Sequence, residues 1–272
     1  MQKRFYTKFQ KMPFEEDATH EFKGHKNICK EELPKWTLET SQKKGSRKPI
    51  SRNLCGFLNT GVGGTIYCGV VDNGKIMGLK LSQYQKDHVV GSLHDLMTRY
   101  VPPVAPHRYK IKFVPVIAPK DKEEEMIELA NFDSKEIVDQ VERKQLHTFR
   151  TPHYCWCDLD SKARCENGII ISDYIIEITI HPWDPDDNRN QGLGKLINLH
   201  PIHADEEGRI YFRRQSSLIR YNATEIATLS HFEAKSRYDQ KISELKKEIS
   251  LAKKEIEDRK AKSSQVQHSP NF

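Results

Sequence analysis

The sequence of 272 residues lacks the signatures of several large protein classes. It contains no run of about 18 apolar residues, so we expect no membrane-spanning helix. It has no Gly-x-Gly-x-x-Gly that opens a helix after a strand and no Walker motif, which argues against the common dinucleotide and nucleoside triphosphate sites. It also lacks a nucleophile elbow on which a Ser/His/Asp or Cys/His hydrolase could be built.

Strong charge asymmetry is missing as well. The chain has 44 Lys and Arg against 38 Asp and Glu, a net charge of +6 that permits an anionic partner such as nucleic acid without requiring one. The basic N-terminus has no continuous apolar core and does not resemble a secretory signal. The six cysteines are scattered, and Cys55 and Cys68 fall in apolar runs. Buried thiols of this kind favour a reducing compartment, and we expect a cytoplasmic protein.

What the sequence does contain is a series of short apolar runs and amphipathic segments, which predicts an α+β fold with a mixed or antiparallel sheet and flanking helices. We expect helices over 50–58 and 82–100, and strands over 65–71, 109–116, 168–180, 196–199 and 208–213. The predicted organisation is one domain over residues 1–230, a coiled-coil helix over 231–262 and a disordered tail over 263–272.

The coiled-coil prediction depends on a heptad pattern near the C-terminus. Apolar residues recur there at alternating spacings of three and four, and Lys and Glu occupy the remaining faces. A solvated single helix is the alternative interpretation, but a stripe this regular usually packs against a partner. The stripe consists of Tyr238, Ile242, Leu245, Ile249, Ala252 and Ile256.

A glycine-rich stretch at residues 57–79 carries the first candidate chemistry. Its second turn, Asp72-Asn73-Gly74, separates two apolar runs and predicts a hairpin. Asp72 leaves the end of the predicted strand, and two further acids, Glu16 and Glu21, lie upstream. Three converging carboxylates could bind Mg²⁺ or Mn²⁺, and Lys23 could contact the same phosphate. With 38 acids in the chain, ordinary surface carboxylates remain the alternative on spacing alone.

These residues resemble the core of the Schlafen family. The similar segments are Glu16-x4-Glu21-Phe22-Lys23, a helix, Phe57-Leu58-Asn59-Thr60, Gly63-Gly64, a strand, Gly69-Val70 and Asp72, followed later by 208–213 and Ser216-Ser217. The resemblance covers roughly residues 14–235. It implies a single Schlafen/AlbA-like lobe and a metal-dependent RNA endonuclease in which Glu16, Glu21 and Asp72 hold Mg²⁺ or Mn²⁺ beside Lys23.

The resemblance also implies partners. Longer Schlafens clasp RNA between two lobes, so a second Schlafen-like lobe is expected from another copy or a relative, joined through the coiled coil. The implied substrates are small or precursor RNAs, including piRNA precursors. The chain departs from the family pattern in a glycine turn that is one residue longer and in Val71, which replaces the first aspartate. A non-catalytic RNA-binding or assembly subunit is therefore the main alternative, and a protein-interaction module that does not touch RNA is a third.

Basic residues form the predicted RNA contacts. Clusters of Lys and Arg bind phosphate backbones without sequence specificity, and aromatic residues near them, such as Trp36, could stack on unpaired bases. A solvated face is the alternative for each group alone. The candidates are Lys43, Lys44, Arg47, Lys48, Arg213 and Arg214.

A second candidate site is a group of soft ligands. His147, His153, Cys155, Cys157 and Cys165 lie within 19 residues, and such ligands at short spacing can hold a structural Zn²⁺. We predict a zinc site at His153, Cys155, Cys157 and Cys165, with reduced cysteines in a loop as the alternative. The zinc site of long Schlafens would fall at 107–109 and after residue 180, where this sequence has no cysteine.

Overall fold

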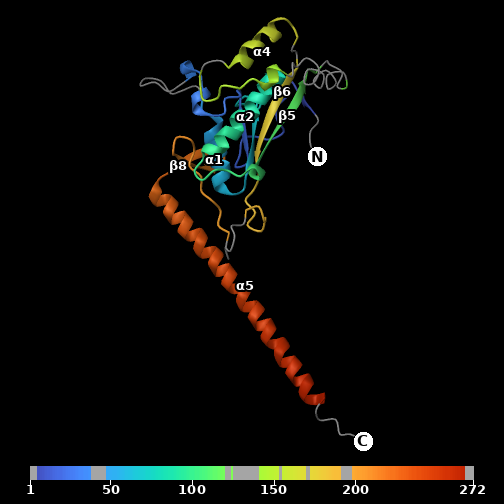
Figure 1. The fold of residues 1–272 in the computed structure, drawn as a ribbon, viewed down its shortest axis with the longest axis vertical. Coiled ribbons are helices and arrows are strands. Elements are labelled where there is room, and N and C mark those ends of the chain that lie inside the picture. The colour runs from blue at the N-terminus through green and yellow to red at the C-terminus, as the bar shows by residue number, and fades with distance from the viewer. Residues whose placement is uncertain are drawn as a thin grey trace. The chain divides into compact units, whose positions relative to one another are not determined.

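A mixed six-stranded sheet organises the chain's first unit, which comprises residues 1–183 and 200–221 (Figure 1). The strand order is β1-β5-β6-β3-β2, and β4 also pairs with β6. β1 is parallel to β5 and β2 is parallel to β3, whereas β6 is antiparallel to β3, β4 and β5. The strands are β1 (Tyr6–Thr7), β2 (His20–Lys23), β3 (Gly64–Cys68), β4 (Leu79–Lys80), β5 (Tyr109–Ile117) and β6 (Asp173–Ile180).

The structure is a computed structural model, and it describes residues 5–37, 47–119, 124, 141–152, 155–169, 172–190 and 198–266. Within these ranges the first unit has three α-helices, α1 (Ile50–Thr60), α2 (Gln83–Arg99) and α4 (Trp156–Glu166). Short 3-10 turns occur at Lys30–Glu32, Lys35–Thr37, Pro106–Arg108 and Glu142–Lys144. No helix of the described residues is both long and apolar enough to span a bilayer.

The side chains of β6 point alternately to the two faces of the sheet, and both faces are covered by other parts of the chain. Tyr174, Ile176 and Ile178 point to the face that α1 and α2 cover, where they join a large buried cluster with Leu54 (Figure 1). Ile175 points to the opposite face and joins a smaller cluster. Successive side chains of a strand point to opposite faces, so an uninterrupted β-branched run is typical of a strand buried on both sides. The predicted mixed α+β architecture is confirmed.

A two-stranded hairpin, β7 (Ile210–Arg214) and β8 (Ser217–Tyr221), packs against α1. Asn59 at the end of α1 holds the segment before the hairpin. Its Nδ2 donates to the carbonyl oxygens of His203 at 2.8 Å and Tyr211 at 2.9 Å, and its Oδ1 accepts from the His203 N–H at 2.7 Å. One buried amide side chain thus satisfies three backbone groups and fixes the hairpin on the helix.

The hairpin predicted around Asp72-Asn73-Gly74 is present in a short form beyond the end of β3. Val70 and Ile76 form an antiparallel bridge. The Val71 N–H donates to the Lys75 carbonyl oxygen at 3.1 Å, and the Met77 N–H donates to that of Gly69 at 2.9 Å. Gly69 has a φ of +101°, which ends the regular strand just before the turn. The chain then continues into β4, which pairs with β6 instead.

The second unit comprises residues 184–199 and 222–272, and its main element is the 44-residue helix α5 (Ala223–Val266). Asn222 caps this helix, because its Oδ1 accepts from Glu225 N at 3.0 Å. The helix begins inside the predicted 1–230 domain and continues four residues past the predicted end at 262. α5 is one long helix, and its pairing with a second helix in a coiled coil stays a prediction. Residues 267–272 of the predicted tail and residues 196–197 of the predicted strand 196–199 lie outside the described residues, and residues 198–199 are not part of a strand.

Candidate functional site

The carboxylate of Glu21 lies at the centre of the predicted acidic site. Glu21 is on the edge strand β2 and is only 6% exposed. Its oxygens accept from Asn53 Nδ2 of α1 at 2.6 Å and from Arg213 Nη1 of β7 at 2.6 Å, and they also pair with Lys23 Nζ. Two cations and one amide therefore compensate the buried negative charge. These three donors occupy most of the acceptor positions of the carboxylate, which leaves little of it for a divalent cation.

Arg213, a predicted RNA contact, is buried beneath this corner. Its guanidinium also donates to the backbone oxygens of Asp17 at 2.6 Å and His20 at 2.8 Å, and it lies 5.0 Å from the centre of the Phe57 ring. The Arg213 side chain is 1% exposed in the ion pair with Glu21. In this structure its charge is directed inward to neutralise a carboxylate, which leaves no guanidinium surface for a phosphate.

Glu16 is the second acid of the corner. Its Oε1 accepts from the Phe22 backbone N–H at 2.8 Å. Burial raises the pKa of Glu16, and the nearby charge of Glu21 raises it further. Glu16 also lines a cavity of about 530 Å³ together with Lys11, Phe22 and Asp72. The two glutamates are thus electrostatic neighbours, and one of them faces an open space.

Asp72 does not join the two glutamates. It lies on the exposed turn after β3 and lines the same cavity as Glu16, while Glu21 is not part of that lining. Of the described residues, one group of three or more His, Cys, Asp or Glu side chains has its ligand atoms within 4.8 Å of one another, and it is not this acidic triple. The structure therefore places the three predicted ligands around one corner without bringing them to one point.

Val71 occupies the position where the family pattern has an aspartate. A Cβ built on Gly24, the residue after Lys23, would lie 3.6 Å from Val71 Cγ1. The Val71 side chain therefore packs beside the end of β2, on which Glu21 and Lys23 are carried. An apolar side chain therefore stands at this position beside Gly24.

Aromatic rings surround the open side of the corner. The Phe14 ring lies 4.3 Å from His20 and 5.4 Å from Tyr67, measured between ring centroids. Phe14, His20 and Tyr67 are each half-buried, so part of every ring faces solvent. Such rings next to acidic and basic groups can stack on unpaired bases.

The sequence profile described as Schlafen, AlbA_2 matches residues 16–222. That interval contains the acidic corner, the sheet from β2 to β6, and the β7–β8 hairpin. The chain belongs to the Schlafen family. This family is associated with nucleases, so the corner around Glu16 and Glu21 is where nuclease chemistry would be sought in this Schlafen protein.

The remaining predicted RNA contacts of this Schlafen chain fall into three groups. Lys43 and Lys44 lie outside the described residues. Arg47 lies 5.0 Å from the ring centre of Trp36, which is 74% exposed, and Lys48 beside it is exposed. Arg214 is exposed at the end of β7, in contrast to its neighbour Arg213.

The predicted zinc ligands separate in the structure. Cys155 and Cys157 come together with His147 and with His88 of α2. His153 lies outside the described residues. Cys165 is eight residues beyond Cys157 on α4, about 12 Å along the helix axis, and cannot share a metal with it.

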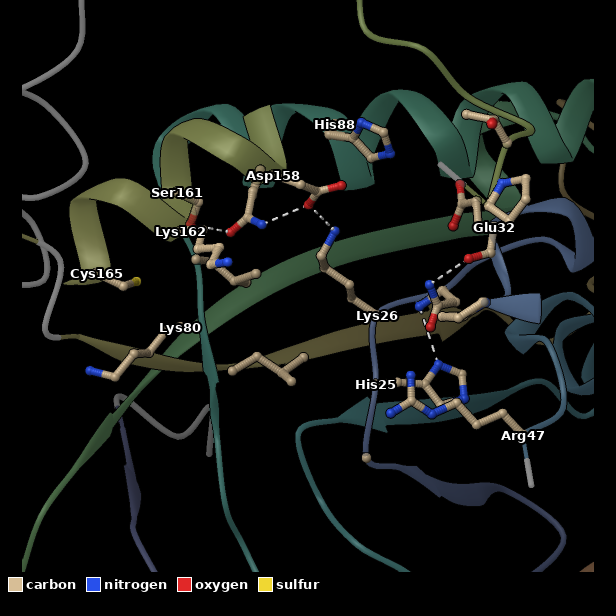
Figure 2. A pocket seen from close by; sticks show the side chains of 18 of the residues that line it. His25, Lys26, Glu32, Arg47, Lys80, His88, Asp158, Ser161, Lys162 and Cys165 are labelled. Atoms are coloured by element: carbon tan, nitrogen blue, oxygen red, sulfur yellow. Dashed lines mark hydrogen bonds and ion pairs between the residues drawn. The ribbon is translucent and has the colours of Figure 1, made fainter. Parts of the chain in front are cut away.

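Sequence reasoning missed His88 because it is 59 positions before His147 and carries no local spacing signal. Its only sequence mark is its place within α2, next to the apolar residues Val89 and Leu93. Figure 2 shows His88 projecting from α2 toward Asp158 of α4, with Cys165 at the other end of that helix. His88, Asp158 and Cys165 all line a cavity of about 470 Å³ that also contains Lys26 and Arg47.

Proposed function

We propose that this chain is an RNA-binding subunit of a Schlafen-type RNA endonuclease in which a second lobe supplies the cleaving carboxylates. The observation that carries the proposal is the state of Glu21, which is 6% exposed and bound by Arg213, Lys23 and Asn53. A metal-binding carboxylate needs free lone pairs directed at the ion. The exposed position of Asp72 and the apolar Val71 support the same proposal.

The RNA-binding part of the proposal is supported by Trp36 and Arg47. A tryptophan that is 74% exposed and held by an arginine 5.0 Å away offers a flat apolar surface beside a positive charge. That combination suits an unpaired base and its phosphate, because stacking is tolerant of sequence and the guanidinium attracts the backbone. Exposed Lys48 adds a second cation next to Arg47.

A catalytic role for this chain is the second candidate, and one observation favours it. Glu16 and Asp72 line the same cavity of about 530 Å³, and Lys11 lines it too. If Glu21 were released from Arg213, the three acids could surround a divalent cation at the wall of that cavity. The cation would orient water and stabilise the charge that develops on the cleaved phosphate.

Binding of a fluorescently labelled single-stranded RNA tests the first part of the proposal. We expect Trp36→Ala and Arg47→Ala each to weaken binding about tenfold, in line with the usual cost of losing one stacked base. Phe232→Ala is the matched control, because Phe232 is also 74% exposed but lies on α5. Equal affinities of the Trp36→Ala variant and the unmodified chain would contradict the proposed RNA surface.

Cleavage of the same RNA with Mn²⁺ or Mg²⁺ separates the two candidate roles. We expect no cleavage by the chain alone, and cleavage with a partner lobe that survives Glu16→Ala and Glu21→Ala in this chain. Loss of cleavage with Glu16→Ala, while RNA binding is retained, would assign catalysis to this chain and overturn the non-cleaving role.

We further propose that α5 joins two copies of the chain as a parallel two-stranded coiled coil. In the heptad register Ile242, Ile249 and Ile256 occupy the a positions and Leu245 a central d position. β-Branched residues at a with Leu at d favour two strands. In a parallel pair, Glu248 and Glu255 at g positions would face Lys253 and Lys260 at e positions of the other copy. At the preceding g position, Lys241 would face Lys246 at an e position of the other copy.

Light scattering of the full chain tests this arrangement. We expect a dimer that Ile249→Lys converts to a monomer. The control is Leu251→Lys, because Leu251 is even more exposed, at 64% against 55%, but lies off the stripe. A monomer in the unmodified protein, or equal effects of the two substitutions, would contradict a coiled coil between copies.

A further inference from the structure

Four soft ligands converge at the α2 side of the first unit, away from the acidic corner. His88 comes from α2, His147 from the connection between β5 and β6, and Cys155 and Cys157 from the start of α4. Their ligand atoms all lie within 4.8 Å of one another. His88, Cys155 and Cys157 are buried and His147 is half-buried.

His88 has a buried ring nitrogen that could serve as a metal ligand. The residue is 7% exposed, and its Nδ1 is buried with no hydrogen-bond partner among the described residues. A buried ring nitrogen without a partner loses its water contacts and gains nothing in return. Asp158 does not bond to this nitrogen, and its Oδ1 accepts instead from Lys26 Nζ at 3.0 Å and Gln85 Nε2 at 2.8 Å. Figure 2 shows these bonds beside the His88 ring.

The spacing of the ligand atoms suits a tetrahedral ion. Zinc bonds of about 2.0–2.3 Å to nitrogen and sulfur place neighbouring ligand atoms about 3.4–3.8 Å apart. The Cys155 Sγ lies 3.6 Å from the His147 Nδ1. The whole group is slightly wider than a filled site, and small side-chain rotations would bring the remaining atoms into range.

Groups next to the four ligands fix the positions of their side chains. Cys155 is the residue that precedes the first turn of α4, and Cys157 lies within that turn, where the helix N-terminus stabilises thiolates. The Thr148 backbone N–H donates to Cys155 Sγ at 3.4 Å. The His147 ring stacks on Trp156 at 5.2 Å and 15°. Hydrogen bonds and packing of this kind fix the direction of metal ligands.

We propose that His88, His147, Cys155 and Cys157 bind a structural Zn²⁺ ion. Two imidazoles and two thiolates complete a tetrahedron, which leaves no open position for substrate. The two thiol protons pass to solvent when the ion binds. The ion ties the connection between β5 and β6 to α2 and so fixes one wall of the cavity that His88 and Thr148 line. None of the four residues lies at the positions where the zinc site of long Schlafens would fall.

Metal titration of the full chain tests the proposal directly. Protein stripped of metal under reducing conditions should take up about one Zn²⁺ per chain, and Co²⁺ should give the absorption of a thiolate-coordinated tetrahedral ion. We expect chelation to lower the melting temperature. Uptake of much less than one ion, or Co²⁺ spectra without thiolate bands, would overturn the proposal even before a variant is made.

Variants then assign the ligands. We expect Cys157→Ser and His88→Gln to weaken zinc affinity by about 100-fold or more, whereas Cys165→Ser should leave it unchanged. Cys165 is the matched control because it is a half-buried cysteine on the same helix. Circular dichroism of the metal-free variants separates loss of a ligand from loss of the fold. Zinc affinity that is the same in Cys157→Ser and Cys165→Ser would show the metal to be adventitious.

Discussion

The acidic corner and the His/Cys cluster differ in what their polar groups already bind. At the corner, Glu21 has two cations and an amide of the protein itself as partners, so its charge is satisfied before any metal arrives. In the His/Cys cluster, His88 Nδ1 has no partner among the described residues, and the four ligands are of two types that zinc prefers, imidazole and thiolate. The corner carries the family motif, and the cluster carries the buried polar atom without a partner.

This difference teaches that a motif and a binding site are separate properties. Both sites are assembled from elements that are distant in sequence, the corner from β2, α1 and β7 and the cluster from α2, α4 and the segment between β5 and β6. The residues of the corner neutralise one another's charges, whereas the ligand atoms of the cluster carry no opposite charges that could do so. Each of the following experiments tests the residue contacts of one of these two sites.

Removing the Arg213 guanidinium should have the largest effect on stability, because the buried negative charge of Glu21 then keeps Lys23 as its remaining cationic partner among the described residues. We expect Arg213→Met to lower the free energy of unfolding by about 3–5 kcal/mol, the usual cost of breaking a buried ion pair. Urea denaturation measures the change. Arg214→Met is the control on the same strand, and its exposed side chain should matter by less than about 0.5 kcal/mol.

The double variant Arg213→Met with Glu21→Gln sharpens this test. A neutral amide at position 21 no longer needs the buried guanidinium, so part of the lost stability should return. If the double variant is as unstable as the sum of the two single variants, Arg213 and Glu21 do not act as a pair, and the closed corner would lose its main support.

Adding a methyl group at Gly91 should have an intermediate effect, and we expect that effect on the zinc affinity of the His/Cys cluster alone. A Cβ at this position of α2 would lie 2.5 Å from Phe149 Cζ, and the Phe149 ring packs edge-on against His88 at 5.1 Å. We expect Gly91→Ala to weaken zinc affinity about tenfold by displacing these rings, although alanine favours the helix by about 1 kcal/mol. Phe149→Leu in the same chain should restore the affinity, and unchanged affinity in Gly91→Ala would speak against this packing.

The smallest effect concerns Glu16. Because its pKa in the folded chain is raised above 4.5, chiefly by burial, the folded state is most favoured while Glu16 is protonated and loses that contribution as pH rises. Glu16→Gln, which removes the ionisation, should therefore raise the free energy of unfolding at neutral pH by about 0.5 kcal/mol.

The increase in the free energy of unfolding caused by Glu16→Gln should become smaller as the pH falls toward the pKa of Glu16 in the unfolded chain. Denaturation at several pH values measures this dependence. Glu15→Gln serves as the exposed neighbouring control. A loss of stability with Glu16→Gln at neutral pH would mean that its ionised carboxylate stabilises the fold, as that of Glu21 does.

Much of the fold could be predicted from local patterns. The helix after Pro49, the helix after Ser82 and the β-branched strand β6 follow from periodicities that depend on few neighbours. The hairpin around Asn73-Gly74 is present but shorter than its two apolar runs suggest, because the chain after Ile76 continues into β4, which pairs with β6.

The candidate sites could be predicted only in part. Cys155 and Cys157 stood out because they are neighbours in sequence, whereas His88 became visible only when α2 and α4 were packed together. The inward turn of Arg213 was equally hidden, because Arg213 and Arg214 look alike in the sequence and alternate faces on the strand. Residues that act within one element can be found from sequence, and those that meet across elements cannot.

Asn59 gives the family motif a different meaning. This asparagine belongs to the segment that resembles the Schlafen core. Its side-chain amide forms hydrogen bonds with backbone groups of His203 and Tyr211, and it thereby positions the hairpin that places Arg213 against Glu21. The same contacts attach the hairpin whether or not this chain cleaves RNA, so a match at Asn59 identifies the fold and does not by itself identify a nuclease.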